Sequence, residues 1–122
     1  MASSTERLHS KRLEDLCKWN GLRQIDEVPE LVRLIIKEPT YKQYGLDKNI
    51  MCPDLFINYY NQNWTIAELK HSRRRTQNAY EQIESGMKLL VDVFGVSLKN
   101  ITGKLVIYTP EEFYYEIMKC KF

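Results

Sequence analysis

The hydrophobic pattern at the start of the chain predicts an amphipathic helix. Leu13, Leu16 and Cys17 stand at positions i, i+3 and i+4, the spacing that places side chains on one face of a helix. Gly21 follows at the position where helices commonly end. We therefore expect a helix over residues 5–20 with one buried apolar stripe.

The next apolar segment, 28–38, fits two kinds of element. Pro29 occupies a position suited to the first turn of a helix, and Pro39 would end it, which favours a helix. The run VRLII at 32–36 would also suit a buried strand. We favour the helix and keep the strand as the alternative. The polar stretch 39–53 is expected to be a loop.

Two runs rich in β-branched and aromatic residues occupy the centre of the chain. They are 55–60 (LFINYY) and 64–70 (WTIAELK), and the polar tripeptide NQN at 61–63 separates them. Strand-forming runs joined by a three-residue connection are typical of a β-hairpin. Two antiparallel strands are therefore predicted here.

The last third of the chain is predicted to contain a helix, a strand and a second helix. Apolar residues recur at helical spacing over 76–94: Ala79, Ile83, Met87, Leu90 and Phe94. The run KLVIY at 104–108 is short and continuous, as in a buried strand. The motif TPEE at 109–112 fits an N-cap, a first-turn proline and a capping-box glutamate. A terminal helix is therefore expected over 110–119.

Length and composition limit the class of protein. With 122 residues, 43% of them hydrophobic and 28% charged, the chain suits a single globular domain over residues 1–122. No apolar stretch approaches the ~20 residues of a membrane-spanning helix, so no membrane role is expected. The order of helices and strands predicts an α/β fold, a small mixed sheet with a central hairpin flanked by helices.

The N-terminal residues and the cysteines indicate an intracellular protein. Residues 1–15 lack the apolar region of a secretion signal, so we expect the cytoplasm, the nucleus or a virus-infected host cell. Cys17, Cys52 and Cys120 form neither a CxxC nor a Cys/His spacing. Neither a disulfide framework nor a zinc site is expected.

Charged residues gather at one end of the expected hairpin. Residues two apart in a strand share a face, so Ile66, Glu68 and Lys70 lie on one side. Asp54 directly precedes the first strand, and antiparallel pairing brings it alongside Glu68 and Lys70. Two carboxylates this close repel each other unless a cation lies between them, and oxygen ligands suit Mg²⁺ or Mn²⁺. A neighbouring ammonium can stabilise negative charge on a phosphate, so the group suits phosphodiester hydrolysis.

Pro53-Asp54, thirteen intervening residues and Glu68-Leu69-Lys70 resemble the signature of the PD-(D/E)XK nuclease superfamily. This superfamily includes restriction endonucleases, archaeal Holliday-junction resolvases and small viral nucleases. The resemblance implies a restriction-endonuclease-like αβββαβ core, of which residues 50–109 match the hairpin, the following helix and the next strand in that order. It also implies a metal-dependent nuclease, with DNA favoured over RNA as its substrate.

The resemblance assigns a role to each residue of the signature. Asp54 and Glu68 would bind Mg²⁺ or Mn²⁺, the Leu69 carbonyl could complete the coordination, and Lys70 would be the catalytic lysine. Many members also carry a supporting glutamine on the following helix and a glutamate on the first helix. The candidates here are Gln82 or Gln77 for the former, and Glu14 or Glu6 for the latter.

The chain has a net charge of +2, and its densest basic run directly follows the signature. Ser72, Arg73, Arg74 and Arg75 are expected to contact phosphates of the nucleic acid. The alternative is a solvated charge run at a helix start, which the helix dipole disfavours. A chain this small leaves little surface for a duplex, which favours a homodimer, as in the resolvases that it resembles.

Other functions remain open from the sequence. A non-catalytic nucleic-acid-binding or assembly module on the same fold is one. An RNA endonuclease of the viral cap-cleaving kind is another; such enzymes often add a histidine from an upstream helix, and only His9 could supply it. Aromatic side chains such as Tyr60 and Trp64 could stack on bases, although core packing is favoured for them. Tyr41 and Tyr44 are the better stacking candidates.

Overall fold

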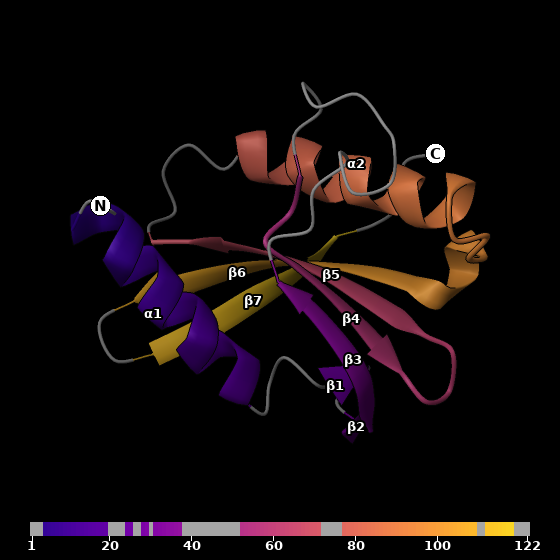
Figure 1. Cartoon of the computed structure of the whole chain (residues 1–122), viewed down its shortest axis with the longest axis horizontal. Helices are drawn as coiled ribbons and strands as arrows, with labels where there is room; N and C mark the ends of the chain where they lie inside the picture. Colours follow the sequence, from indigo (N-terminus) through magenta and orange to yellow (C-terminus); the bar gives the residue numbers. More distant parts are fainter. Residues whose placement is uncertain are drawn as a thin grey trace.

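A computed structural model describes residues 4–19, 24–25, 28–29, 31–37, 52–71, 77–109 and 112–118. Its elements in chain order are α1 (Ser4–Lys18), β1 (Gln24–Ile25), β2 (Val28–Pro29), β3 (Val32–Lys37), β4 (Leu55–Tyr59), β5 (Trp64–Lys70), α2 (Gln77–Asp92), the 3₁₀ helix η3 (Leu98–Asn100), β6 (Ile101–Thr109) and β7 (Glu112–Met118). The fold is mixed α/β, as the sequence predicts (Figure 1).

Five strands form the main sheet in the order β3-β4-β5-β6-β7. Neighbouring strands are antiparallel except β5 and β6, which are parallel. A parallel pair needs a crossover between its strands, and α2 lies in this connection. β1 and β2 form a separate two-stranded sheet in the described part of the chain.

The two long helices cover opposite faces of the sheet (Figure 1). Alternate residues of each central strand therefore enter different cores. The α2 core comprises Phe56, Ile66, Ala79, Ile83, Met87, Leu89, Leu90, Ile101, Leu105 and Ile107. The α1 core comprises Leu13, Leu16, Cys17, Leu55, Ile57, Tyr59, Ala67, Leu69 and Val106. The sheet is covered on both sides, which explains why β4 is buried along its whole length.

The observed hairpin, α1 and α2 agree with the elements that the sequence predicts. β4 and β5 pair antiparallel around the turn at 60–63, where Gln62 adopts a left-handed φ of 73°. The predicted helix 5–20 is α1, and the predicted helix 76–94 is α2. The predicted strand 104–108 is the centre of the longer β6. Most of the predicted loop 39–53 lies outside the described residues.

The helix favoured over 28–38 is wrong, and the alternative strand is observed as β3. Ile35 pairs with Ile57 and Lys37 with Leu55 at the edge of the sheet. Pro29, whose position suggested a helix start, belongs to β2 instead. The β-branched residues of VRLII gain backbone pairing and partial burial on β4, and these tertiary contacts outweigh the local proline signal.

The terminal helix predicted over 110–119 is also wrong, because the chain returns as β7. Thr109 pairs with Glu112 and Val106 with Tyr115, in antiparallel register with β6. The TPEE motif fits a helix start, but the segment after it is rich in aromatic and β-branched residues, which favour a strand where a partner edge is available. In the described residues, no helix is long and apolar enough to cross a membrane.

Candidate functional site

The hairpin register places Asp54 opposite Glu68 at the open end of the β4–β5 pair. Leu55 pairs with Ala67, so one step further along each chain Asp54 faces Glu68. The two carboxyl groups form a hydrogen bond with each other. Asp54 and Glu68, which the sequence places together at this edge, do lie in contact, and Lys70 is near enough to act on the charge of Glu68.

Asp54 is held from two sides. Its Oδ2 accepts a hydrogen bond from the Leu69 backbone N–H at 2.8 Å, and its Oδ1 lies 3.2 Å from Nε2 of His9 on α1. Burial tends to raise the pKa of Asp54, but the hydrogen bonds from His9, Glu68 and the Leu69 amide outweigh it and lower the pKa. Asp54 is therefore the ionised member of the carboxyl pair.

Glu68 is the protonated member. Its side chain is on the α2 face of β5 and only 2% exposed. Burial, the hydrogen bond to Asp54 and the negative charge of Asp54 raise the pKa of Glu68 to about 10, although the Lys70 ammonium partly opposes them. At neutral pH the proton on Glu68 removes the charge repulsion that two ionised carboxyl groups would have.

Two buried side-chain oxygens in the described residues lack a hydrogen-bond partner, Glu68 Oε2 and Gln82 Oε1. The amide of Gln82 is oriented by its other end, because Nε2 donates to the Cys52 carbonyl at 3.1 Å. A buried polar atom without a partner costs on the order of 1–3 kcal/mol. Both atoms belong to residues that the sequence indicates for the site. Each of these two oxygens could therefore accept a hydrogen bond or coordinate a ligand.

A relay of side chains on the α1 side reaches Asp54. Arg12 can only donate, so its Nη1 donates to Nδ1 of His71. Nε2 of His71 then donates to Nδ1 of His9 at 3.1 Å, which leaves the proton of His9 on Nε2, facing Asp54. Burial, together with the charges of Arg12 and His9, lowers the pKa of His71 and favours this neutral form. The Arg12 guanidinium also lies 3.9 Å from the ring centre of Tyr108.

The sequence alone indicates His9 only as a ligand for the RNA-cleaving alternative, and it gives His71 no place in the metal site. A signal for His9 was present, because it stands four residues before Leu13 and thus on the buried stripe of the helix. His71 continues the chain directly after Lys70. Its contact with α1 needed the tertiary structure.

Other residues chosen from the sequence lie away from Asp54 and Glu68. Glu14 is exposed on α1, about 140° around the helix from His9, so the structure does not bring it to the carboxyl pair. Within the described ranges, no three His, Cys, Asp or Glu side chains group closely enough to hold a metal ion. Ser72, Arg73, Arg74 and Arg75 are outside those ranges, as are the side chains of Glu6 and Gln77.

Gly86 lets α2 lie close against the start of the hairpin. A Cβ at this position would stand 2.9 Å from Cγ of Pro53 and 2.9 Å from Cε1 of Phe56. Pro53 directly precedes Asp54, so the approach of the helix positions the backbone that carries the first carboxylate. Gln82 reaches Cys52 from one turn earlier on the same helix.

No family model, curated protein or solved structure matches this chain. What the site can do follows from its own groups: an ionised and a protonated carboxyl in contact, an ammonium beside them and an oriented amide. Oxygen atoms of this kind bind hard divalent cations, and the ammonium of Lys70 can neutralise an anionic substrate.

Proposed function

We propose that the protein is a metal-dependent nuclease of the PD-(D/E)XK superfamily, acting on DNA. The order α1, β3, β4, β5, α2, β6 follows the αβββαβ core that the sequence resemblance implies. β3 would be the first strand of that core, in the segment where the sequence alone favours a helix. This agreement supports a restriction-endonuclease-like core.

The observation that carries the proposal is the contact of the partly buried Asp54 with the buried Glu68, one of whose oxygens has no partner. These groups fit a divalent cation, which would replace the shared proton and give Oε2 a partner. Asp54 and Glu68 would hold Mg²⁺ or Mn²⁺, with the Leu69 carbonyl as a further oxygen. A bound cation would act as a Lewis acid and activate a water for attack on phosphorus.

The chain's own residues supply the remaining steps. Lys70, at the end of β5, would stabilise the negative charge that builds on the phosphate in the transition state. His9 and the Leu69 N–H fix the orientation of Asp54, as groups around metal ligands commonly do. Gln82 presents an oxygen without a partner to a water or a substrate group.

The test is a cleavage panel of supercoiled plasmid, linear duplex, four-way junction, single-stranded DNA and RNA with Mg²⁺, Mn²⁺ or chelator. Asp54→Asn, Glu68→Gln and Lys70→Ala should each reduce the rate by roughly 100-fold or more. The exposed residues Glu81 and Lys88 on α2 give matched controls, and Glu81→Gln and Lys88→Ala should retain activity.

A folded wild-type protein that binds nucleic acid but cuts no member of the panel would contradict the proposed nuclease activity. The same fold would then serve as a binding or assembly module. Isothermal titration with Mn²⁺ gives a second readout, because the carboxyl pair should bind the ion whether or not cleavage occurs. Binding that survives in Asp54→Asn and Glu68→Gln would place the cation elsewhere.

His9 favours RNA cleavage as a second candidate. Its Nε2 stands 3.2 Å from Asp54 on an upstream helix. Viral cap-cleaving enzymes, which share the PD…E arrangement, often place a histidine ligand on such a helix. To bind a cation, His9 would have to move its proton from Nε2 to Nδ1. Imidazole suits transition metals better than Mg²⁺, so this candidate requires RNA cleavage that Mn²⁺ supports more strongly than Mg²⁺ and that His9→Ala abolishes.

A further inference from the structure

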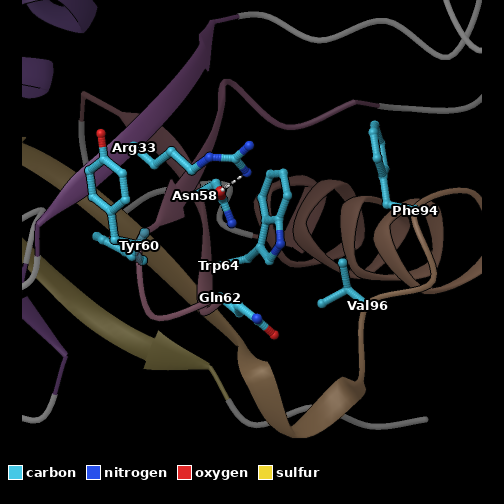
Figure 2. Close-up of a pocket in the computed structure, with 8 residues that line it drawn as sticks. Arg33, Asn58, Tyr60, Gln62, Trp64, Phe94 and Val96 are labelled. Atoms are coloured by element: carbon cyan, nitrogen blue, oxygen red, sulfur yellow. Dashed lines mark hydrogen bonds between the residues drawn. The ribbon is translucent and has the colours of Figure 1, made fainter.

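An open pocket lies at the turn end of the hairpin, on the face of the sheet that α2 covers elsewhere (Figure 2). Its volume is about 450 Å³, within the range of roughly 300–1,000 Å³ that small-molecule sites occupy. The lining residues are Arg33, Asn58, Tyr59, Tyr60, Gln62, Trp64, Phe94 and Val96. α2 ends at Asp92, which leaves this part of the sheet uncovered.

Aromatic rings dominate the apolar part of the lining. The ring centres of Trp64 and Phe94 are 5.9 Å apart with a tilt of 39°, so the two rings form one wall. Tyr60 stands on the other side of Trp64 in the view of Figure 2. Tyr60 is 69% exposed and Phe94 40% exposed. The expectation that Tyr60 packs in the core is therefore wrong, and its ring is available to a ligand.

Polar groups are placed at fixed positions around the rings. Nη1 of Arg33 donates to Oδ1 of Asn58 at 3.2 Å, and Nδ2 of Asn58 donates to the Asn63 carbonyl at 3.4 Å. Asn58 is buried, so it anchors the guanidinium of the exposed Arg33 at the rim. A guanidinium has five N–H donors, which leaves several for a phosphate. Gln62 adds an amide from the left-handed turn position.

We propose that this pocket binds an unpaired nucleobase and its adjoining phosphate. The base would stack on the Trp64 and Tyr60 rings, and Arg33 would contact the phosphate. Stacking on aromatic rings is tolerant of sequence because every base has a π face, and Arg is suited to bidentate contact with phosphate. The source of the base is a single-stranded segment of the nucleic acid that the candidate nuclease acts on, so this part rests on the proposed function.

The pocket and the carboxyl pair lie at opposite ends of β5. Trp64 and Glu68 are on the same face of this strand, four residues or about 13 Å apart. Ile66 between them is buried under α2, so a nucleic-acid strand bound in the pocket would pass around the helix to reach the carboxyl pair.

Binding can be measured without cleavage, in chelator, by the fluorescence of Trp64. A Trp19→Phe background removes the other tryptophan, which packs on Phe113 at the α1 side. The probes are a 12-nucleotide single strand of DNA, the same strand as RNA, a blunt duplex and adenosine monophosphate. Tyr60→Ala, Phe94→Ala and Arg33→Gln test the pocket. Val93→Ala is the matched control, because Val93 is exposed beside Phe94 but does not line the pocket.

The single strands should quench Trp64, and the blunt duplex should quench it less. Tyr60→Ala and Phe94→Ala should each weaken strand binding about 5- to 100-fold. Arg33→Gln should make the affinity less dependent on salt concentration, by the amount expected for the loss of about one phosphate contact. Val93→Ala should bind as the wild type does. Unchanged strand affinity in both ring variants would overturn the proposal, and so would quenching by the mononucleotide alone.

The outcomes separate this proposal from the nuclease itself. Strand binding that depends on Tyr60 and Phe94, in a protein that cuts nothing, would support the pocket and contradict the enzyme. Cleavage that depends on Glu68, together with strand binding that the pocket variants leave unchanged, would support the nuclease and contradict the pocket proposal. Circular dichroism of each variant checks that the fold is retained.

Discussion

Asp54 and Glu68 lie opposite each other at the open end of a hairpin and hold one proton between them. Two charged carboxylates at this distance would destabilise the fold, and the same two groups are candidate ligands for a cation. Keeping a proton on one carboxyl removes the repulsion that two charges would cause. The proposed divalent cation would remove the same repulsion and would also give Glu68 Oε2 a partner.

The metal-free protein should become less stable as the pH rises from about 5 to 9. The pKa of Glu68 is raised from 4.5 to about 10 by folding, so its contribution is fully present below pH 4.5 and is lost as the pH rises through 10. The slope can reach about 1.4 kcal/mol per pH unit. Denaturant unfolding in chelator measures it, and Glu68→Gln should remove this slope while Glu81→Gln keeps it.

Cation binding should depend on pH in the opposite sense. Because a bound ion displaces the proton of Glu68, the increase in melting temperature caused by Mn²⁺ should grow between pH 6 and 9. Differential scanning fluorimetry with and without Mn²⁺ measures this increase. An increase of equal size at both pH values, or one retained by Glu68→Gln, would mean that the ion binds outside the carboxyl pair.

His9→Ala should weaken cation binding by roughly 10- to 100-fold, the usual cost of removing a group that orients a ligand. Its Nε2 no longer holds Oδ1 of Asp54, so the pKa of Asp54 should also rise. Calorimetry with Mn²⁺ at two pH values separates these effects. Lys11→Ala, an exposed change on the same helix, should leave the affinity unchanged; an equal loss there would point to general damage of α1.

Lys104→Met should remove a gain in stability that the wild type shows above pH 8. The side chain of Lys104 is 0% exposed on the α1 face of β6, and burial lowers its pKa from 10.5 to about 8. The unfolded chain binds the ammonium proton more tightly than the folded chain, so the wild type should become more stable as the pH rises from 8 to 10.5. Denaturant unfolding at several pH values measures this gain, and Lys88→Met, exposed on α2, should keep it.

Gly86→Ala should lower the stability by about 1 kcal/mol. Overpacking against Pro53 and Phe56 costs roughly 1–3 kcal/mol, and the better helix propensity of alanine returns up to about 1 kcal/mol. The strain falls next to Asp54, so cation affinity should drop as well. Glu81→Ala on the exposed side of α2 should be neutral or stabilising. A more stable Gly86→Ala variant with unchanged affinity would show that the helix can move without disturbing the site.

Local sequence pattern is enough to predict the hairpin, α1, α2 and the pairing of Asp54 with Glu68. These features depend on local periodicity and on the antiparallel register around a short turn. Residues close together in the sequence decide both. The same is true of Lys70, which shares a face with Glu68 because strand residues alternate.

Segments 32–37 and 112–118 become strands because an open sheet edge is available to each. The partner edge of 32–37 is β4, which lies later in the chain, and that of 112–118 is β6, directly before the TPEE motif that fits a helix start. Packing also sets the contact of His9 with Asp54 across 45 residues, the exposure of Tyr60 and the pocket at the turn. Distances between helix and sheet, and the space left where a helix ends, come from packing and not from local pattern.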